Sequence, residues 1–297
     1  MKGFILSASL LFALSTSAFA EDSCTGAQCL PKSVKDSCTV QTVGGCIDWE
    51  QGIVYATGMG VPNDSMRSVA QKRYSAYQAA RVVAQRNLLQ MIEEVQIDSN
   101  QTVKMGMLEN DEINVQVHGT LKQVSEVGKP KVAGDGSTWV TMKMYLRDIR
   151  SILEQNKQFE SVEAESSHKK DVAKSAAPKA SGDANTVYTG LIIDAHRSGV
   201  KPAMSPKVFG PAGDEVYGSF KIEREFALEF GVAGYVKTLA QAESNERVKG
   251  HPLVIKGKKA SGAKGSDVKI SQEDAQLIKQ LERSQAFLRE GRVVIVL

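Results

Sequence analysis

The stretch that decides the fold of the first half of the chain is residues 52–146, which opens with GIVYATGMG (52–60) and closes with WVTMKMYL (139–146). The first segment is a short apolar run and the second alternates apolar and polar residues, so each predicts a β-strand. Between them, residues 65–97 repeat apolar side chains at intervals of three and four, which predicts a long amphipathic helix. We therefore expect an α+β module in which this helix packs across an antiparallel sheet.

Two further segments between the helix and the last strand are predicted as strands. Residues 101–105 form a short strand candidate, and residues 112–119 alternate apolar and polar side chains with period two. Residues 121–127 continue this second strand past a bend at Gly119. This interpretation places His118 at an exposed strand end, where no ligand role is expected.

The first half of the predicted helix is rich in alanine, and Asp64 or Ser65 is its predicted N-cap. Ala76, Ala80 and Ala84 recur every four residues and fall on one face of the helix. Small side chains let a helix come close to a sheet, so we expect this face to pack on the strands. A second interpretation is that the alanine-rich half also contacts another copy of the protein.

The N-terminus has the pattern of a secretory signal peptide. Lys2 precedes an apolar run over residues 4–14, and residues 18–20 read Ala-Phe-Ala. A basic start, a short apolar stretch and an A-x-A site predict export, with residues 1–20 as the signal and Glu21 as the first mature residue. The apolar run is too short for a bilayer span. We expect a periplasmic or outer-membrane-associated protein.

All four cysteines lie in one short segment of the chain: Cys24, Cys29, Cys38 and Cys46. An even number of cysteines in an exported protein predicts two disulfides, for which three pairings remain open. A zinc site is the alternative, but the spacings are not those of a zinc knuckle and no histidine lies nearby. We therefore interpret residues 21–49 as a small disulfide-bonded cap on the first module, with no metal.

The charge balance does not indicate nucleic acid as a partner. The chain has 37 basic and 34 acidic residues, and removal of the signal peptide takes away only Lys2, which leaves 36 against 34. A nucleic-acid-binding domain usually carries a clear basic excess. The sequence predicts no nucleic-acid partner and no cofactor.

The order of motifs in residues 52–146 resembles a known bacterial family. These motifs are YATGMG (55–60), the alanine-rich residues 71–84, RNLL (86–89) and VQIDS (95–99). They resemble the envelope lipoprotein family that includes the flagellar assembly protein FlgP, and they are similar to the amino-terminal module of FlgT. The resemblance implies an outer-membrane-associated assembly linked to the flagellum. This chain lacks the lipobox of that family, so direct lipid anchoring does not carry over.

A change in composition separates residues 50–153, the first module, from a second module. Residues 154–185 contain much Ser, Ala, Lys and Glu and few large apolar side chains, which predicts a flexible linker. Residues 186–297 then predict a second α+β module that ends in a strand. Its strand candidates are residues 187–195, 201–209, 214–218, 231–240, 252–256 and 292–297. Ser271 and Asp274 predict a capped helix that buries Ala275, Ile278 and Leu281 and ends at Gly291.

The sequence presents no catalytic motif. Gly58-Met59-Gly60 lacks the third glycine of a dinucleotide fingerprint, and the four histidines have no metal-ligand spacing. One glycine-rich segment is a candidate contact loop for anionic glycans or lipid head groups. Its basic residues are Lys256, Lys258, Lys259, Lys264 and Lys269.

Taken with the export signal, these features predict a non-catalytic envelope protein that joins a cell-envelope or outer-membrane assembly. Self-association, or contact with other envelope proteins, would run through edge strands and the alanine-rich helix. The alternative is a periplasmic binding module for a small ligand or glycan. An enzyme is the third and least favoured class.

Overall fold

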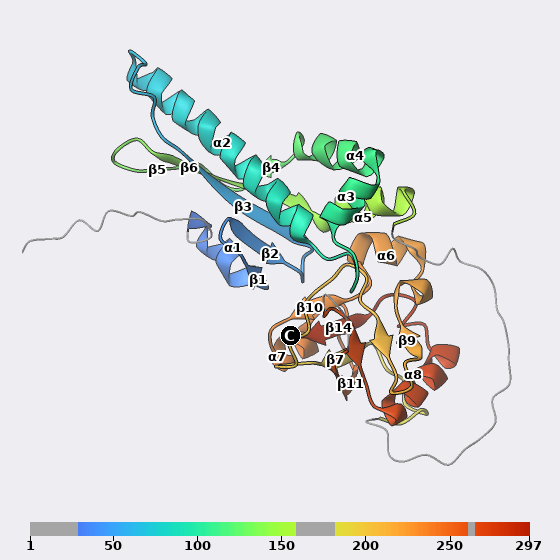
Figure 1. Cartoon of the computed structure of the whole chain (residues 1–297). Coiled ribbons are helices and arrows are strands. Elements are labelled where there is room, and N and C mark those ends of the chain that lie inside the picture. The colour runs from blue at the N-terminus through green and yellow to red at the C-terminus, as the bar shows by residue number, and fades with distance from the viewer. Residues whose placement is uncertain (1–28, 159–181, 261–264) are drawn as a thin grey trace, which may run out of the picture.

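The computed structural model describes residues 29–158, 182–260 and 265–297, and it confirms a mixed α+β fold in two modules (Figure 1). The signal peptide, Cys24, Lys264 and most of the predicted linker lie outside the described residues. The first module is built on an antiparallel sheet and the second on a parallel sheet. A module with an antiparallel sheet is therefore followed by a second module that ends in a strand.

Two long paired strands form the centre of the first sheet. β3 (Ile53–Gly60) and β6 (Thr138–Tyr145) are antiparallel along their full lengths, as predicted from residues 52–60 and 139–146. The full strand order is β1-β2-β3-β6-β4, with β5 on the remaining part of β6. The short strands are β1 (Val40–Gln41), β2 (Gly45–Asp48), β4 (Ser125–Glu126) and β5 (Lys131–Val132).

Helix α2 (Val69–Glu94) crosses this sheet and confirms the predicted long helix. Its N-cap is Ser68, which forms a capping box with Gln71, so the predicted caps Asp64 and Ser65 are wrong. Val69, the first residue of α2, is 65% exposed and lies outside the buried face of the helix. The buried residues of α2 are Ala76, Ala80, Ala84, Leu88, Met91 and Ile92.

Glycines on β3 explain why alanines line the facing side of α2. A Cβ atom added at Gly58 would lie 2.3 Å from the carbonyl oxygen of Ala80, and one added at Gly60 would lie 2.0 Å from that of Ala76. Strand and helix backbones are therefore in direct contact, which only glycine on one side and small residues on the other allow. The Gly-x-Gly and Ala-x-x-x-Ala patterns form one packing motif.

The strands predicted over residues 101–105 and 112–119 are wrong, because both segments are helical. α3 (Val103–Glu109) is capped by Thr102 and α4 (Asp111–Leu121) by Asn110. On α4 the buried side chains are Ile113, Val117 and Leu121, four residues apart, whereas Val115 is 69% exposed. The segment appeared to alternate because Ile113 and Val117 share the buried face of the helix, whereas Val115 between them faces solvent. His118 is exposed in the last turn of α4.

A further helix, α5 (Leu146–Gln155), follows β6 directly and was not predicted. It buries Ile149, Arg150 and Leu153 against the rest of the molecule. Because α5 continues to Gln155, the linker cannot begin at residue 154 as predicted. Residues 159–181 of the predicted linker lie outside the described part of the chain.

The cysteine-rich segment covers one end of the sheet on the face that α2 leaves open. α1 (Lys32–Ser37) packs Leu30 and Val34 beside Cys38 and Cys46, with Tyr55 of β3 partly buried against them. A disulfide joins Cys38 to Cys46, as expected for the cap. Cys29 is disulfide-bonded as well.

The second module contains a four-stranded parallel sheet, in the order β10-β14-β7-β11. The chain ends in its second strand, β14 (Val293–Val296), which confirms the predicted terminal strand. β14 pairs with β7 (Leu191–Asp194), which is short and fully apolar over its first three residues, as expected for a sheet buried on both faces. The flanking strands are β10 (Gly234–Val236) and β11 (Leu253–Lys256).

A small mixed sheet and three helices complete this module (Figure 1). The sheet contains β12 (Lys258–Lys259), β13 (Val268–Lys269), β8 (Val208–Phe209) and β9 (Glu215–Tyr217). The helices are α6 (Arg224–Phe230), α7 (Leu239–Ser244) and α8 (Gln272–Ser284), and a short 3-10 turn spans Ser219–Lys221.

Three sequence predictions in this module need correction. The strand expected over residues 201–209 is confined to Val208–Phe209. The strand expected over residues 231–240 is only three residues long, because Thr238 and Gln241 form a capping box that begins α7. The cap of α8 at Ser271 is confirmed, but the helix ends at Ser284. Gly291, with φ +64°, lies in the turn before β14 and does not stop the helix.

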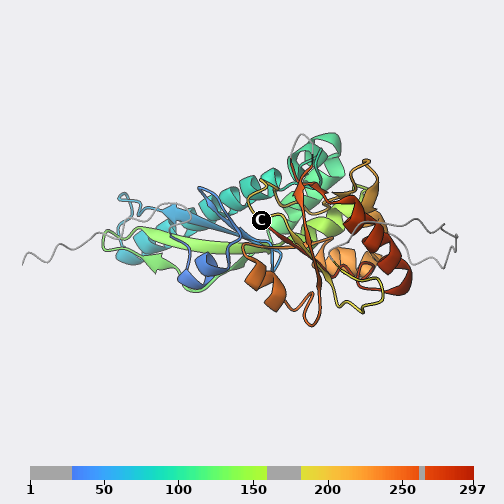
Figure 2. The ribbon, with the colours of Figure 1, turned by 90° about the horizontal axis from the view of Figure 1, so that it is seen from below.

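Two views at right angles show an elongated first module (Figures 1 and 2). The N-terminal half of α2, with the adjoining ends of β3 and β6 and with β5, projects away from the second module. We call this projection the arm. The opposite end of the first module, at α5, lies against α6, and one cluster of buried apolar residues runs through both modules.

Candidate functional site

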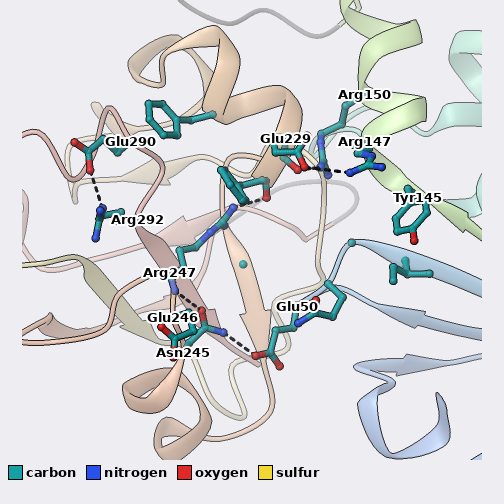
Figure 3. Close-up of a pocket in the computed structure, with 16 residues that line it drawn as sticks. Glu50, Tyr145, Arg147, Arg150, Glu229, Asn245, Glu246, Arg247, Glu290 and Arg292 are labelled. Carbon is teal, nitrogen blue, oxygen red and sulfur yellow. Dashed lines mark hydrogen bonds and ion pairs between the residues drawn. The ribbon is translucent and has the colours of Figure 1, made fainter. Parts of the chain in front are cut away.

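A pocket of about 760 Å³ lies where the two modules meet (Figure 3). The first module lines it with the turn between β2 and β3, the end of β6 and the start of α5. The second module lines it with α6, the segment after α7 and the turn before β14. The charged lining residues are Glu50, Arg147, Arg150, Glu229, Glu246, Arg247, Glu290 and Arg292.

Arg150 reaches from α5 into the second module. Its side chain is 4% exposed, and its Nε and Nη2 donate hydrogen bonds to the carbonyl oxygens of Leu228 and Glu229 at 2.9 Å and 2.8 Å. Burial, with the nearby charge of Arg247, lowers the pKa of Arg150 to about 10, so it stays charged at neutral pH. A buried charge of this kind requires the hydrogen bonds that it makes here.

Arg247 approaches the same helix end from within the second module. Its Nη2 donates to the carbonyl oxygen of Gly231 at 3.1 Å and to that of Phe230, and its Nη1 donates to that of Val293 at 3.3 Å. Burial lowers the pKa of this guanidinium as well. Gly231 has φ +76° and ends α6, so the last carbonyls of the helix are directed towards the two arginines.

This geometry follows from the chemistry of a helix C-terminus. The last carbonyls of a helix lack partners within the helix and carry partial negative charge, which cations stabilise. Arginine supplies several donors on a rigid plane and suits this role. The two guanidinium groups therefore connect α5, the end of α6 and the first residue of β14 at one point.

Polar pairs surround this connection and also cross between the modules. Arg147 pairs with Glu229 at 3.1 Å, and the amide of Asn245 donates to Glu50 at 2.9 Å (Figure 3). Arg224 binds Glu154 through two hydrogen bonds. Burial and the charge of Asp48 raise the pKa of Glu50.

The backbone joins the modules too. The amides of Met204 and Ser205 donate to the carbonyls of Gln96 and Ile97 at 2.9 Å and 2.7 Å, which links two segments remote in sequence. Beside it, Trp49 meets Tyr235 edge to face, with ring centroids 5.4 Å apart. Apolar, backbone and charged contacts thus fix the modules in one arrangement.

The polar groups of the pocket are mostly engaged with one another. The two buried arginines bind main-chain carbonyls, and Glu229, Glu50 and Glu290 have partners among the lining residues. In residues 29–158, 182–260 and 265–297, no group of three His, Cys, Asp or Glu side chains could hold a metal ion. The arrangement joins modules, and its chemistry is that of a structural junction.

The predicted basic loop begins at β11, the edge strand opposite to β10 in the parallel sheet. It continues into β12 and β13 of the small mixed sheet. Lys256 ends β11, Lys258 and Lys259 form β12, and Lys269 lies on β13. All four side chains are exposed, and Lys258 is directly opposite Lys269 in the antiparallel pair. Lys264 lies outside the described residues.

The sequence analysis missed one member of this basic group. The amide of Lys201 donates to the carbonyl of Gly265 at 2.9 Å, which brings an exposed lysine from the segment after β7 to the same place. More than 50 residues separate Lys201 from β12 and no local pattern marks it.

The outer side of α2 carries the second candidate surface. Tyr74 and Val82 are 66% and 54% exposed, and Gln78 lies between them at intervals of four residues. These residues form one stripe on the helix, turned away from the buried alanines. We call Tyr74, Gln78 and Val82 the outer α2 stripe. At the tip of the arm, Met59, Val61, Val69 and Val132 are also exposed.

Comparison with known proteins gives one match. Residues 190–297 match the family model for the second domain of Treponema pallidum Tp0624, a bacterial domain family. The match begins just before β7 and extends to the last residue, so it covers the parallel sheet and its helices. No curated protein matches the chain.

The match does not include residues 52–146, so the resemblance of that stretch to the FlgP family stays a prediction. Among the described helices, none has the length and apolar character needed to cross a membrane.

Proposed function

We propose that this protein is a non-catalytic, exported envelope protein that self-associates through its arm and contributes to a periplasmic or outer-membrane-associated assembly. The observation that carries the proposal is the outer α2 stripe, with Tyr74 and Val82 exposed and Gln78 half-buried, on a module that is fixed firmly to its neighbour. A rigid body with a projecting apolar stripe can present that surface to a partner at a constant angle.

A second copy of the chain is the partner that best fits this surface. If two α2 helices pair antiparallel about a two-fold axis, Gln78 of each copy lies near the axis and Tyr74 of one copy faces Val82 of the other. Aromatic and aliphatic side chains would then be buried at the centre of the contact, as in stable interfaces. Arg81 and Arg86 lie beside the stripe on the same helix and supply a polar rim.

The solution size of the mature protein tests this proposal. We expect residues 21–297, produced in the periplasm, to sediment as a dimer or larger species, and Tyr74→Lys with Val82→Lys to give a monomer that melts at an unchanged temperature. Val115→Lys on α4, where the native valine is equally exposed, is the matched control and should leave the size unchanged. A native protein that is monomeric at all concentrations and stays in the soluble periplasm would overturn the proposal.

The resemblance to the FlgP family supports a flagellar role for the assembly. A deletion strain should then lose motility, and the Tyr74→Lys, Val82→Lys variant should fail to restore it. Full motility of the deletion strain would remove the flagellar part of the proposal and leave the envelope assembly to be tested by size and fractionation.

The junction pocket favours a second candidate function, a periplasmic binding module for a small ligand or glycan. Its volume of about 760 Å³ is in the range of ligand sites, and Phe226, Phe230 and Tyr145 contribute aromatic surface to it. A thermal-shift screen of small carboxylates and sugars tests this function. Stabilisation that Phe226→Ala abolishes, together with a monomeric native protein, would favour the binding module over the assembly.

A further inference from the structure

We propose that the second module docks on a membrane surface through its basic residues, with anionic phospholipid head groups as the ligand. The surface consists of Lys201, Lys256, Lys258, Lys259 and Lys269, and we call it the basic ledge. It belongs to the module that lies away from the arm, so it is independent of the self-association proposed above (Figures 1 and 2).

The distribution of ion pairs between lysines and carboxylates in the second module supports this inference. Four of its lysines bind carboxylates: Lys207 with Glu215, Lys221 with Glu282, Lys249 with Glu246 and Lys279 with Asp214. The five ledge lysines form no ion pair within the described part of the chain, although each is exposed. Lys237, outside the ledge, is likewise exposed and forms no ion pair among the described residues, so the ledge is distinguished by five unpaired lysines that lie together and remain available to an external anion.

Three separate segments of the chain contribute lysines to the ledge. The repulsion between these like charges lowers the stability of the folded state. Lys258 and Lys269 face each other across an antiparallel pair, an arrangement that like charges disfavour. A Cβ atom added at Gly265 would lie 2.8 Å from the ammonium of Lys259, so this side chain lies directly against the backbone beside Lys201. A bound anionic surface would remove the repulsion.

The neighbouring residues extend the positive surface. Arg197 is exposed in the turn that follows β7, and it adopts a left-handed conformation with φ +59°, which is uncommon for arginine. The acidic groups nearby are engaged: Asp267 is buried and accepts the amide of Lys207, and Asp194 accepts the amide of His196. Positive charge therefore dominates this side of the module.

Lysines on exposed strand ends favour a lipid surface over a glycan site. An ammonium group is a strongly hydrated point charge on a flexible stem, which suits head groups in many orientations. Clustered lysines close to an anionic membrane each contribute to binding, and the attraction falls off within a Debye length. A surface assembled in this way recognises charge density and requires no shaped pocket.

Vesicle co-sedimentation of the mature protein tests the inference, with phosphatidylcholine vesicles that either contain or lack phosphatidylglycerol. We expect binding only where phosphatidylglycerol is present, and weaker binding as salt is added. Lys258→Gln with Lys269→Gln should reduce partitioning by about 25-fold, since each lysine contributes a factor of roughly five. Lys122→Gln with Lys249→Gln changes net charge equally outside the ledge and should reduce partitioning far less.

Three results would overturn the inference: no binding to either vesicle, equal losses from the two double variants, or binding to an acidic polysaccharide without binding to vesicles. The Tyr74→Lys, Val82→Lys variant separates this inference from the proposed self-association. It leaves the ledge intact and adds two lysines on the arm, so its binding to vesicles per chain should not fall below that of the native protein.

Discussion

Arg150 and Arg247 come from different modules, yet their guanidinium groups bind the four consecutive carbonyls of residues 228–231 at the end of α6. Like charges would ordinarily repel at such a place, and burial adds to the cost of each. The carbonyl partners and the negative end of the helix offset that cost. The pair therefore fixes the second module to α5 and sets the direction in which the arm projects.

Removal of Arg150 should loosen this connection. Arg150→Met keeps most of the side-chain volume but leaves the carbonyls of Leu228 and Glu229 without their donors. An unsatisfied buried carbonyl costs about 1–3 kcal/mol, so we expect a loss of that size in the free energy of unfolding, measured by urea denaturation. Arg147→Gln removes a solvent-exposed ion pair and should cost less than about 1 kcal/mol. Equal losses would show that Arg150 has no special role at the junction.

A substitution on the buried face of α2 should destabilise the first module. Ala80 is fully buried against β3, and Ala80→Leu adds three heavy atoms to a backbone contact that has no free space. Overpacking of this kind costs roughly 1–3 kcal/mol, read from thermal or urea unfolding. Gln78→Leu, in the outer α2 stripe, should hardly change melting and should change the size of the assembly. If both variants melt earlier by the same amount, the face assignment of the helix is wrong.

Stability should respond to pH through Asp48. This carboxyl is 1% exposed on β2, and burial raises its pKa above the ordinary value of 3.8 although the amide of Gln51 donates to it. At pH values between the unfolded and the folded pKa, Asp48 is protonated in the folded state and ionised in the unfolded state. This group therefore destabilises the fold above its folded pKa, and the penalty disappears as the pH falls towards 3.8.

The variant Asp48→Asn retains an acceptor for Gln51 and removes the titration. We expect it to be more stable than the native protein at neutral pH, and the difference should shrink as the pH is lowered through the window above 3.8. Urea unfolding at a series of pH values provides the measurement, with Glu243→Gln, an exposed residue of α7, as a control for net charge. A difference that grows on acidification would contradict the assigned direction of the pKa.

Loss of the disulfide should affect the cap before the rest of the molecule. The bond between Cys38 and Cys46 spans eight positions and joins the end of α1 to β2. Cross-links of short loops contribute roughly 2–3 kcal/mol, so Cys38→Ser with Cys46→Ser should lower stability by that amount. Hydrogen exchange should increase at residues 30–48 and remain unchanged in β14. Free thiols at these two positions in protein from its native compartment, or a bound zinc ion, would contradict this prediction.

Strong local periodicity explains which parts of the fold the sequence predicted. The pairing of β3 with β6, the Ala76, Ala80 and Ala84 face of α2 and the terminal strand β14 all follow from patterns within one segment. Residues 113–121 fit two periods at once, because Ile113, Val115 and Val117 alternate while Ile113, Val117 and Leu121 repeat every four residues. The capping side chain of Asn110 was the signal that favoured a helix.

The junction and the ledge could not be predicted in the same way. Arg150 lies 78 residues from Leu228, and its role depends on where α6 ends in space. Lys201 joins the ledge through a backbone contact with Gly265. Both depend on tertiary proximity that no local pattern encodes, whereas the lysines around β12 were visible as a charge cluster.

Site-specific photo-crosslinking at Gln78, in cells that assemble the native envelope, tests the central claim of self-association most directly. A photoreactive residue placed there lies at the centre of the outer α2 stripe. We predict a crosslinked product of twice the chain mass whose linked peptide comes from α2 of a second copy, and no such product from the same residue at Val115. Absence of this product at Gln78, or equal yields at the two positions, would contradict the account.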